Sequence, residues 1–135
     1  MRVELRVQNQ LLCSDWHAEY AHFGVTSRRD NYTLTLANFS GNAGDAMTSQ
    51  WQNKSCDLNG SPFGFVVDGS KFYAGGWWVT DSQYVCSNLN GLWGRNANWF
   101  DGVRWVPITD RLAEPQAFPP DIVLTEMKLR PYSDT

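Results

Sequence analysis

The chain is 135 residues long, enough for one domain with a real core. It has 11 Lys and Arg against 14 Asp and Glu, a net charge of −3, which argues against a nucleic-acid partner because such a partner requires a basic face. No apolar run of about 18 residues is present, which argues against a membrane span. Met1 is followed by alternating side chains rather than by the apolar core of a signal peptide, so we expect no export signal in this sequence.

The first part of the chain predicts an antiparallel meander. Residues 2–7 alternate between apolar and charged side chains, which is typical of a half-buried strand. Residues 16–25 alternate in part, residues 32–36 alternate again, and the charged segment 27–31 predicts a turn between them. Three strands joined by short links favour antiparallel neighbours.

A short helix is predicted next, over about residues 45–52. Asp45 would cap its first turn, because a carboxylate can accept hydrogen bonds from the free N–H groups there. Met47 and Trp51 are four residues apart, so both would face the core.

The second half predicts short strands separated by long ordered loops. Residues 63–67 and 71–79 have strand composition, and residues 103–106 are strand-like. Residues 109–121 include three prolines and predict an irregular excursion. Residues 122–129 predict the last strand, with Ile122 on the same face as Leu124.

Together these elements predict an α+β fold, mostly antiparallel β-sheet with long ordered loops and one or two short helices. A single tryptophan-rich stretch, GGWWVTDSQYVCSNLNG at residues 75–91, stands out in it. Adjacent tryptophans on a strand point to opposite faces, so at least one must be covered. Asn and Gly tolerate left-handed backbone, so residues 88–91 predict a tight, ordered turn. The stretch is either a loop-built binding site or a Trp-rich core followed by a turn.

This stretch resembles the centre of the fibrinogen C-terminal globular domain, the fibrinogen-related domain. Other segments resemble the family in the same order: MRVELRV at the start, NYTLTLANFSGNAGDAM at 31–47, FDGVRW at 100–105 and TEMKLRP at 125–131. The resemblance covers essentially the whole sequence and implies a twisted antiparallel sheet. Because the family's domain is longer at its N-terminal side, we expect residues 1–135 to form a single domain without that N-terminal subdomain. A sheet edge and an apolar face would then be exposed.

The resemblance also implies a calcium loop ahead of the two tryptophans, where the family has an Asp-x-Asp pair. Asp57 and Asn59 are the nearest match and are slightly displaced along the sequence. Only one of them is an acid, so calcium binding is expected to be weakened. The alternative is a plain Asx turn.

A ligand pocket in the loops after the Trp-Trp strand is the second implication. Its predicted lining is Tyr84, Cys86, Ser87, Asn98, Trp99 and Asp101. Asp101 resembles the acid of the family's peptide-binding pocket, and a carboxylate there could accept a hydrogen bond from an amine or a sugar hydroxyl. The alternatives are an Asp-Gly turn for Asp101 and a core position for Trp99.

Three cysteines, Cys13, Cys56 and Cys86, permit one disulfide and one free thiol, or no disulfide at all. In the family, a cysteine before the Asn-Leu-Asn-Gly turn pairs with another just ahead of the Trp-Trp segment. The residue near that earlier place is Gly69, so the family's pocket disulfide is expected to be absent. From the residues alone, Cys56 could pair with Cys86 or with Cys13.

No nucleophile–base or acid–base constellation is visible, so we do not expect an enzyme. The leading hypothesis is an extracellular recognition module that binds a carbohydrate with an acetylated sugar, or a protein. The alternative is a degenerate structural or association fragment without ligand binding, and the protein is a candidate for homo-oligomerisation.

Sequons for N-glycosylation support a secreted location. They begin at Asn31, Asn38, Asn53 and Asn59.

Overall fold

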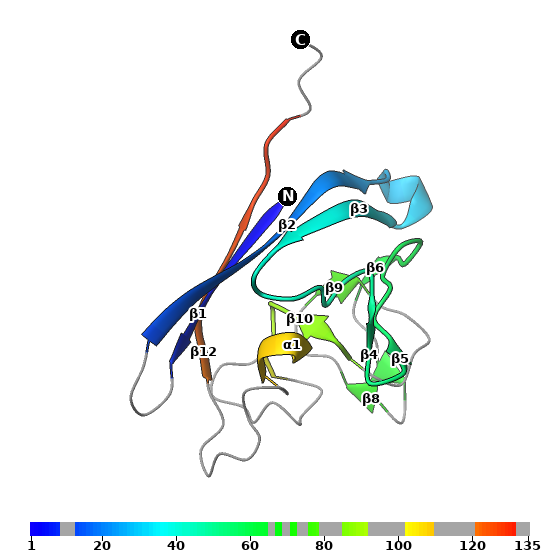
Figure 1. The fold of residues 1–135 in the computed structure, drawn as a ribbon. Coiled ribbons are helices and arrows are strands. Elements are labelled where there is room, and N and C mark those ends of the chain that lie inside the picture. Colours follow the sequence, from blue (N-terminus) through cyan, green and yellow to red (C-terminus); the bar gives the residue numbers. More distant parts are fainter. Residues whose placement is uncertain are drawn as a thin grey trace.

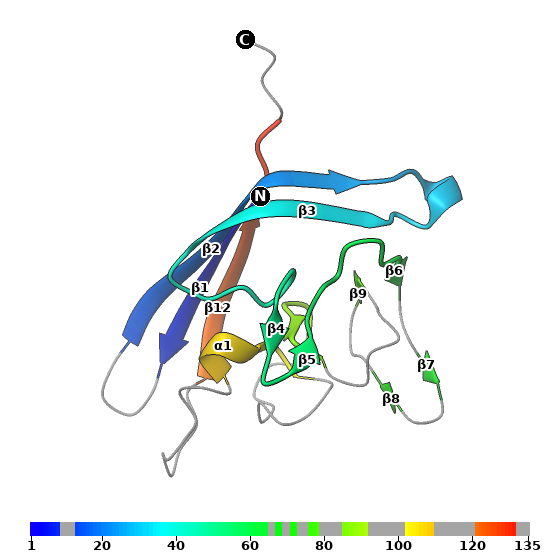
Figure 2. The ribbon, with the colours of Figure 1, turned by 45° about the vertical axis from the view of Figure 1, so that its right-hand side comes forward.

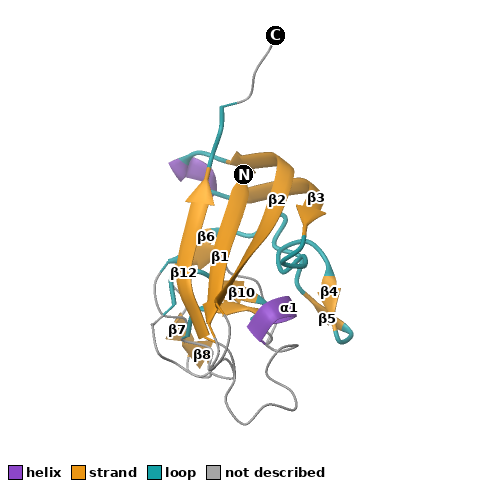
Figure 3. Cartoon of the chain, turned by 60° about the vertical axis from the view of Figure 1, so that its left-hand side comes forward, coloured by secondary structure: helices purple, strands orange, loops and turns teal. Residues whose placement is uncertain are grey.

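The computed structural model describes residues 1–8, 13–64, 67–68, 71–72, 76–78, 85–91, 102–109 and 121–131. A curved, four-stranded antiparallel sheet lies on one side and short strand pairs lie on the other (Figure 1). The sheet has the strand order β12-β1-β2-β3, so that β12 and β3 are its two edges (Figure 3). These strands span Arg2–Gln8 (β1), Cys13–Val25 (β2), Leu34–Gly41 (β3) and Asp121–Lys128 (β12). The predicted antiparallel meander is confirmed.

The remaining elements are short. A 3₁₀ turn, η1, spans Arg28–Asp30 between β2 and β3. The small strands are Gln50–Trp51 (β4), Lys54–Ser55 (β5), Phe63–Gly64 (β6), Val67–Asp68 (β7), Lys71–Phe72 (β8), Trp77–Trp78 (β9), Ser87–Asn88 (β10) and Arg104–Trp105 (β11), followed by helix α1 over Val106–Thr109. Pairs form between β4 and β5, β6 and β9, β7 and β8, and β10 and β11, with β7–β8 farther from the sheet than β6–β9 (Figure 2). In the part of the protein that the structure describes, no helix is long and apolar enough to cross a membrane.

The two faces of the sheet follow the alternation in β1. Val3, Leu5 and Val7 are buried in the core, as predicted. The outer face is charged instead: the Arg2 guanidinium lies 2.9 Å from the Glu4 carboxylate, and the Lys128 ammonium lies 2.9 Å from the same carboxylate. These two cations, Lys128 first, lower the pKa of Glu4. The exposed pairs are screened by solvent, so the buried face supplies most of the stability.

The predicted faces of the last strand are partly wrong. Lys128, Glu126 and Leu124 pair with the outward residues of β1, but a register shift then occurs opposite Arg6 and Val7. The irregularity pairs Ile122 with the inward Val7, so Ile122 is buried and does not share a face with Leu124. A β-bulge adds one residue to one strand, which reverses the alternation beyond it.

The predicted helix over residues 45–52 is also wrong. Asp45 does act as a cap, since its carboxylate accepts hydrogen bonds from the N–H groups of Met47 (3.0 Å) and Thr48 (2.9 Å). The carbonyl of Met47 accepts a hydrogen bond from Leu58 N, and the carbonyl of Ser49 from Cys56 N, each at 2.8 Å. Because these carbonyls bond a different segment, the helical i-to-i+4 ladder cannot continue. The segment bends and enters β4.

Asp45 also accepts a hydrogen bond from a buried tyrosine hydroxyl. The Tyr20 ring is fully buried, and its OH donates a hydrogen bond of 2.7 Å to Asp45 Oδ1. Burial, together with this neighbouring carboxylate, raises the pKa of Tyr20 far above its ordinary value of about 10.

This pKa shift predicts loss of stability at alkaline pH. The unfolded protein ionises its tyrosines from about pH 10 while the folded protein keeps Tyr20 neutral, so the stabilisation is complete below that pH and is lost as the pH rises. A phenolate absorbance titration should show one tyrosine that ionises only when circular dichroism reports unfolding. Tyr20→Phe should remove that coupled step, and a Tyr20 that titrates in the folded protein would contradict the prediction.

Candidate functional site

The two adjacent tryptophans of β9 are both covered. Trp77 and Trp78 are 3% and 8% exposed. The prediction that at least one of them is buried is confirmed, and in fact both are buried. Their indole nitrogens are also used: Trp77 Nε1 donates to Ser87 Oγ at 3.3 Å, and Trp78 Nε1 donates to the Tyr32 carbonyl at 3.2 Å. Strand β9 therefore belongs to the core.

The turn after it, residues 88–91, is ordered, as predicted. The Asn88 side chain is fully buried, and its Oδ1 accepts a hydrogen bond of 3.0 Å from Asn90 N. Asn90 Nδ2 in turn donates to the Gly76 carbonyl at 2.8 Å. These bonds tie the turn to the residue just before β9.

The same turn lies against residues 102–105, the described part of the FDGVRW segment. Strand β10 pairs with β11 so that Ser87 is opposite Trp105 and Asn88 is opposite Arg104. Farther along, a Cβ added to Gly91 would lie 2.2 Å from the Gly102 carbonyl oxygen, so the two backbones are in direct contact. The fold thus brings the Asn-Leu-Asn-Gly turn beside the residue that follows Asp101.

We expect Gly91→Ala to damage this junction. The new methyl group would overlap backbone atoms of Gly102, which cannot move away as a flexible side chain would. A loss of about 1–3 kcal/mol in the free energy of unfolding follows, the range of overpacking changes. Gly64→Ala is the matched control, since its Cβ would meet nothing within 4 Å. Urea unfolding of both variants checks the prediction, and equal stabilities would contradict it.

A disulfide joins Cys56 to Cys86, with their Cα atoms 5.4 Å apart. Both cysteines are buried, whereas Cys13 is an exposed free thiol. This settles the choice of partner that the sequence left open. The bridge is one of the two pairings that the residues left open, and its partner for Cys86 lies much earlier in the sequence than residue 69, near which the family has its cysteine. The bridge fastens the segment after β9 to the turn after β5.

Only part of the predicted ligand-binding set lies in described residues. Cys86 and Ser87 are both buried, Cys86 in the disulfide and Ser87 under the Trp77 indole. The other predicted positions, Tyr84, Asn98, Trp99 and Asp101, lie outside the described residues. The structure therefore pairs Ser87 with Trp105 through β10–β11, and it places Cys86 and Ser87 beneath the surface.

The two predicted calcium ligands form an Asx turn. Asn59 donates twice to Asp57 Oδ1, from its backbone N at 2.9 Å and from its side-chain Nδ2 at 3.1 Å. Asn59 Oδ1 accepts the Leu36 N–H of strand β3 at 2.7 Å. Calcium takes about six to eight oxygens, whereas one carboxylate and one amide that already accept hydrogen bonds make a poor ligand set. Within the described residues, no group of three or more His, Cys, Asp or Glu side chains could hold a metal ion.

Sequence patterns gave no role to Arg104, which forms a buried polar pair with the turn residue Asn88. Both side chains are buried, and they lie opposite each other on β10 and β11. A charged residue between apolar neighbours, as in the segment VRWV, is the signal that would have drawn attention to Arg104.

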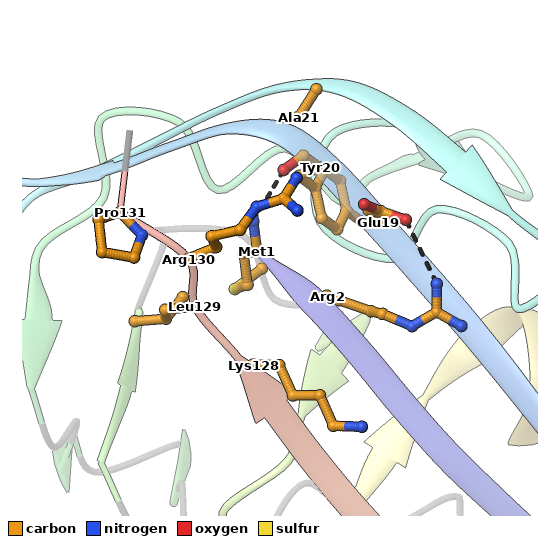
Figure 4. A pocket seen from close by; sticks show the side chains of 9 residues that line it. All are labelled: Met1, Arg2, Glu19, Tyr20, Ala21, Lys128, Leu129, Arg130 and Pro131. Atoms are coloured by element: carbon orange, nitrogen blue, oxygen red, sulfur yellow. Dashed lines mark hydrogen bonds and ion pairs between the residues drawn. The ribbon is translucent and has the colours of Figure 1, made fainter. Parts of the chain in front are cut away.

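A separate hollow of about 580 Å³ lies at the end of the main sheet where β1 begins and β12 ends (Figure 4). Arg2, Lys128 and Arg130 line it together with Glu19, and Arg2 forms an ion pair with Glu19 at 3.3 Å. None of the predicted ligand or calcium residues lines this hollow, so it is not the predicted site.

Comparison with known proteins gives concordant matches. The family described as "Fibrinogen beta and gamma chains, C-terminal globular domain" matches residues 1–132. Protein scabrous of Drosophila melanogaster is 35% identical over 115 residues, which are 77% of this chain and 13% of that protein. Human Fibrinogen C domain-containing protein 1 is 32% identical over 129 residues, 87% of this chain and 25% of that protein. The present sequence therefore spans a quarter or less of these two relatives.

A solved structure agrees with the described fold. The fibrinogen-like globe domain of human ANGPTL2 superimposes with a TM-score of 0.54 at 28% identity. The match covers 78% of this chain and 50% of the solved chain. The mostly antiparallel fold with little helix is thereby confirmed.

Proposed function

Because the protein belongs to the fibrinogen-related family, we propose that it recognises a ligand outside the cell. The family is named for the globular domain that ends the fibrinogen beta and gamma chains. The proposed ligand is either a carbohydrate with an acetylated sugar or a protein. The match over residues 1–132 carries this proposal. The family is non-catalytic, and its domains are typically extracellular binding modules. The buried disulfide between Cys56 and Cys86 is consistent with an oxidising, extracellular compartment.

The geometry of residues 85–91, the described part of the chain that next follows β9, supports ligand binding there. The segment is held at three points: by the disulfide at Cys86, by the bond from Asn90 to the Gly76 carbonyl, and by the contact of Gly91 with Gly102. Loops that are fixed before a ligand arrives lose less conformational entropy on binding. Such loops, positioned by a core strand, are a common construction of recognition sites.

We assign the residues of this surface two kinds of role. Asp101 would accept a hydrogen bond from an amine or sugar hydroxyl, with Tyr84, Asn98 and Trp99 lining the same pocket. Cys86 and Ser87 would support the pocket from below, since both are buried. The position of Gly102 against Gly91 supports this assignment, because it draws the residue next to Asp101 toward the turn.

A sugar-bead assay tests the proposal directly. Beads carrying an N-acetylated hexosamine should retain the protein, and beads carrying the same hexosamine without the acetyl group should not. Asp101→Asn should reduce retention at least tenfold. The matched control is Asp15→Asn, which removes an exposed carboxylate that pairs with Arg6 on the outer face of the sheet. Equal retention on both beads would refute acetyl recognition, and a panel of extracellular proteins would then test the protein-ligand form.

Calcium is proposed in a supporting role only. A cation near Asp57 would hold the loops and would not contact the ligand. Calorimetric titration with calcium, and thermal melting with and without a chelator, test this proposal, because binding to the folded state alone raises the melting temperature. Absence of both heat and shift would remove calcium from the proposed function and leave ligand recognition to be judged by the bead assay.

A second candidate function is association through the edge strand β12. Three apolar side chains on or beside this edge are exposed, Val123 by 42%, Met127 by 37% and Leu129 by 62%. An edge strand with exposed apolar side chains favours pairing with another strand, here from a second copy of the protein. Sedimentation over a range of concentrations should show dimers that Met127→Lys weakens. Dimers without sugar retention would favour this candidate, and a monomer at all concentrations would exclude it.

A further inference from the structure

The four N-glycosylation sequons have the same motif but different surroundings. All four asparagines are exposed, so exposure of the acceptor alone does not distinguish them. Their side-chain amides and their hydroxyl residues do differ in the hydrogen bonds that they make. An acceptor that the fold itself uses is a poor glycan carrier, because the bulky modification would compete with the native contact.

The residues of the sequon at Asn59 take part in hydrogen bonds that hold the native fold. Asn59 Oδ1 accepts the Leu36 N–H at 2.7 Å, and its Nδ2 donates to Asp57 at 3.1 Å. The hydroxyl residue of this sequon, Ser61, is buried, and its carbonyl accepts the Leu34 N–H at 3.0 Å. Residues 59–61 therefore cover the first half of the β3 edge. An oligosaccharide on Asn59 Nδ2 would lie at this contact between residues 59–61 and strand β3.

In two further sequons the hydroxyl group already makes a hydrogen bond within the fold. Thr33, which belongs to the sequon of Asn31, donates from Oγ1 to the Asp30 carbonyl at 2.7 Å. Ser55, which belongs to the sequon of Asn53, accepts the Asp57 N–H at 3.3 Å. In both, the hydroxyl helps to hold a turn.

The sequon at Asn38 differs from the other three. Asn38 and Ser40 are both exposed, and neither side chain takes part in the side-chain hydrogen bonds found among the described residues. The residue between them, Phe39, packs against the buried Tyr20 ring with a centroid distance of 5.6 Å. Asn38 itself has left-handed backbone, with a φ of +62°, on the edge strand β3. The sequon is thus anchored by its central residue while its acceptor amide and hydroxyl face solvent.

We propose that Asn38 carries an N-linked glycan and that Asn59 does not. The inference rests on the proposed extracellular location, since the modification requires the secretory pathway. Asn38 Nδ2 attacks the anomeric carbon of an oligosaccharide linked to a lipid pyrophosphate. A C–N bond forms, the bond from that carbon to the phosphate oxygen breaks, the lipid pyrophosphate leaves, and the amide proton passes to a base of the transferase.

A glycan at Asn38 would protect the remaining half of the β3 edge. The Leu34 and Leu36 amides of this strand already bond to Ser61 and Asn59. A bulky, hydrated group two residues beyond Leu36 would hinder any strand from pairing farther along the same edge. The edge at β12 would then be left as the one open to strand addition among the described strands of the main sheet.

The test expresses all 135 residues behind a cleavable secretion leader in eukaryotic cells. Peptide N-glycosidase converts a glycosylated asparagine to aspartate, so peptide mapping reports each site separately. We expect conversion at Asn38 and none at Asn59. Asn38→Gln should lose one glycan mass and leave the melting temperature of the deglycosylated protein unchanged, whereas Asn59→Gln should keep the glycan and melt at a lower temperature.

Two results would overturn the inference: a secreted, folded protein with Asn38 unmodified, or one with Asn59 modified. Glycans at Asn31 or Asn53 in addition to Asn38 would support it, and glycans there with Asn38 bare would overturn it. Because the leader supplies entry to the secretory pathway, a bare Asn38 rejects this site without bearing on ligand recognition. Failure of sugar retention in the bead assay would likewise leave the site mapping valid.

Discussion

Replacement of Trp105 by alanine is expected to lower the free energy of unfolding by about 3–5 kcal/mol, the range found for buried aromatic side chains. Trp105, on strand β11, is fully buried in the hydrophobic core, which also includes residues of the main sheet. Its indole N–H also donates to two carbonyls, those of Ala43 and Gly44, each at 3.1 Å. The variant would leave a large cavity and two carbonyls without this donor. Urea unfolding followed by circular dichroism gives the free energy.

Trp105→Phe separates packing from hydrogen bonding. It retains most of the ring and removes the donor, so a smaller loss of about 1–3 kcal/mol is expected. Trp51, which is only half-buried, provides a second comparison, because Trp51→Ala should have less effect than Trp105→Ala. A Trp105→Ala protein as stable as the wild type would contradict the central position of this side chain.

Removal of the disulfide is the second large effect. The double variant Cys56→Ser, Cys86→Ser is expected to lose about 2–5 kcal/mol, as for native disulfides in small domains. The bridge closes a loop with a sequence separation of 30, and both sulfurs lie in the core, so the variant also buries two hydroxyls. Thermal melting of the oxidised wild type, the reduced wild type and the variant measures the loss.

Cys13→Ser is the control for this experiment. Cys13 is exposed and has a free thiol, so its replacement should leave the melting temperature within error of the wild type. If the double variant also melts like the wild type, then the disulfide does not hold the segment after β9. The bead assay on the same variants would show whether ligand retention depends on the bridge.

Local alternation predicted the sheet well because its strands obey a period of two. Val3, Leu5 and Val7 face the core as their spacing indicated. The failures come from contacts between distant segments. The predicted helix was excluded by bonds from Leu58 and Cys56, and the face of Ile122 was reversed by an irregularity opposite Val7. Neither partner can be identified from the short sequence window that suggested the element.

The candidate site was predictable to the extent that its motifs are local. The ordered turn at residues 88–91 follows from its Asn and Gly residues, and the adjacency of Trp77 and Trp78 predicted cover for at least one of them, whereas both are buried. The disulfide partner of Cys86 did not follow, because a disulfide depends on Cα separation in the fold, which spacing along the sequence does not give. Asn59 fits both a calcium ligand and a turn residue by type, and the structure shows the turn.

The pairing of β1 with β12 sets an order on the assembly of the domain. Strand β1 lies between β2, which follows it directly, and β12, whose residue Lys128 pairs with Arg2. During synthesis the β1–β2 hairpin can form early, but one side of β1 must wait for β12 to leave the ribosome. Pairings so distant in sequence slow folding, and exposed strand edges favour misassembly meanwhile. Since β1 begins beside the end of β12, a circular permutant that joins them through a short linker would make this pairing local and should fold faster.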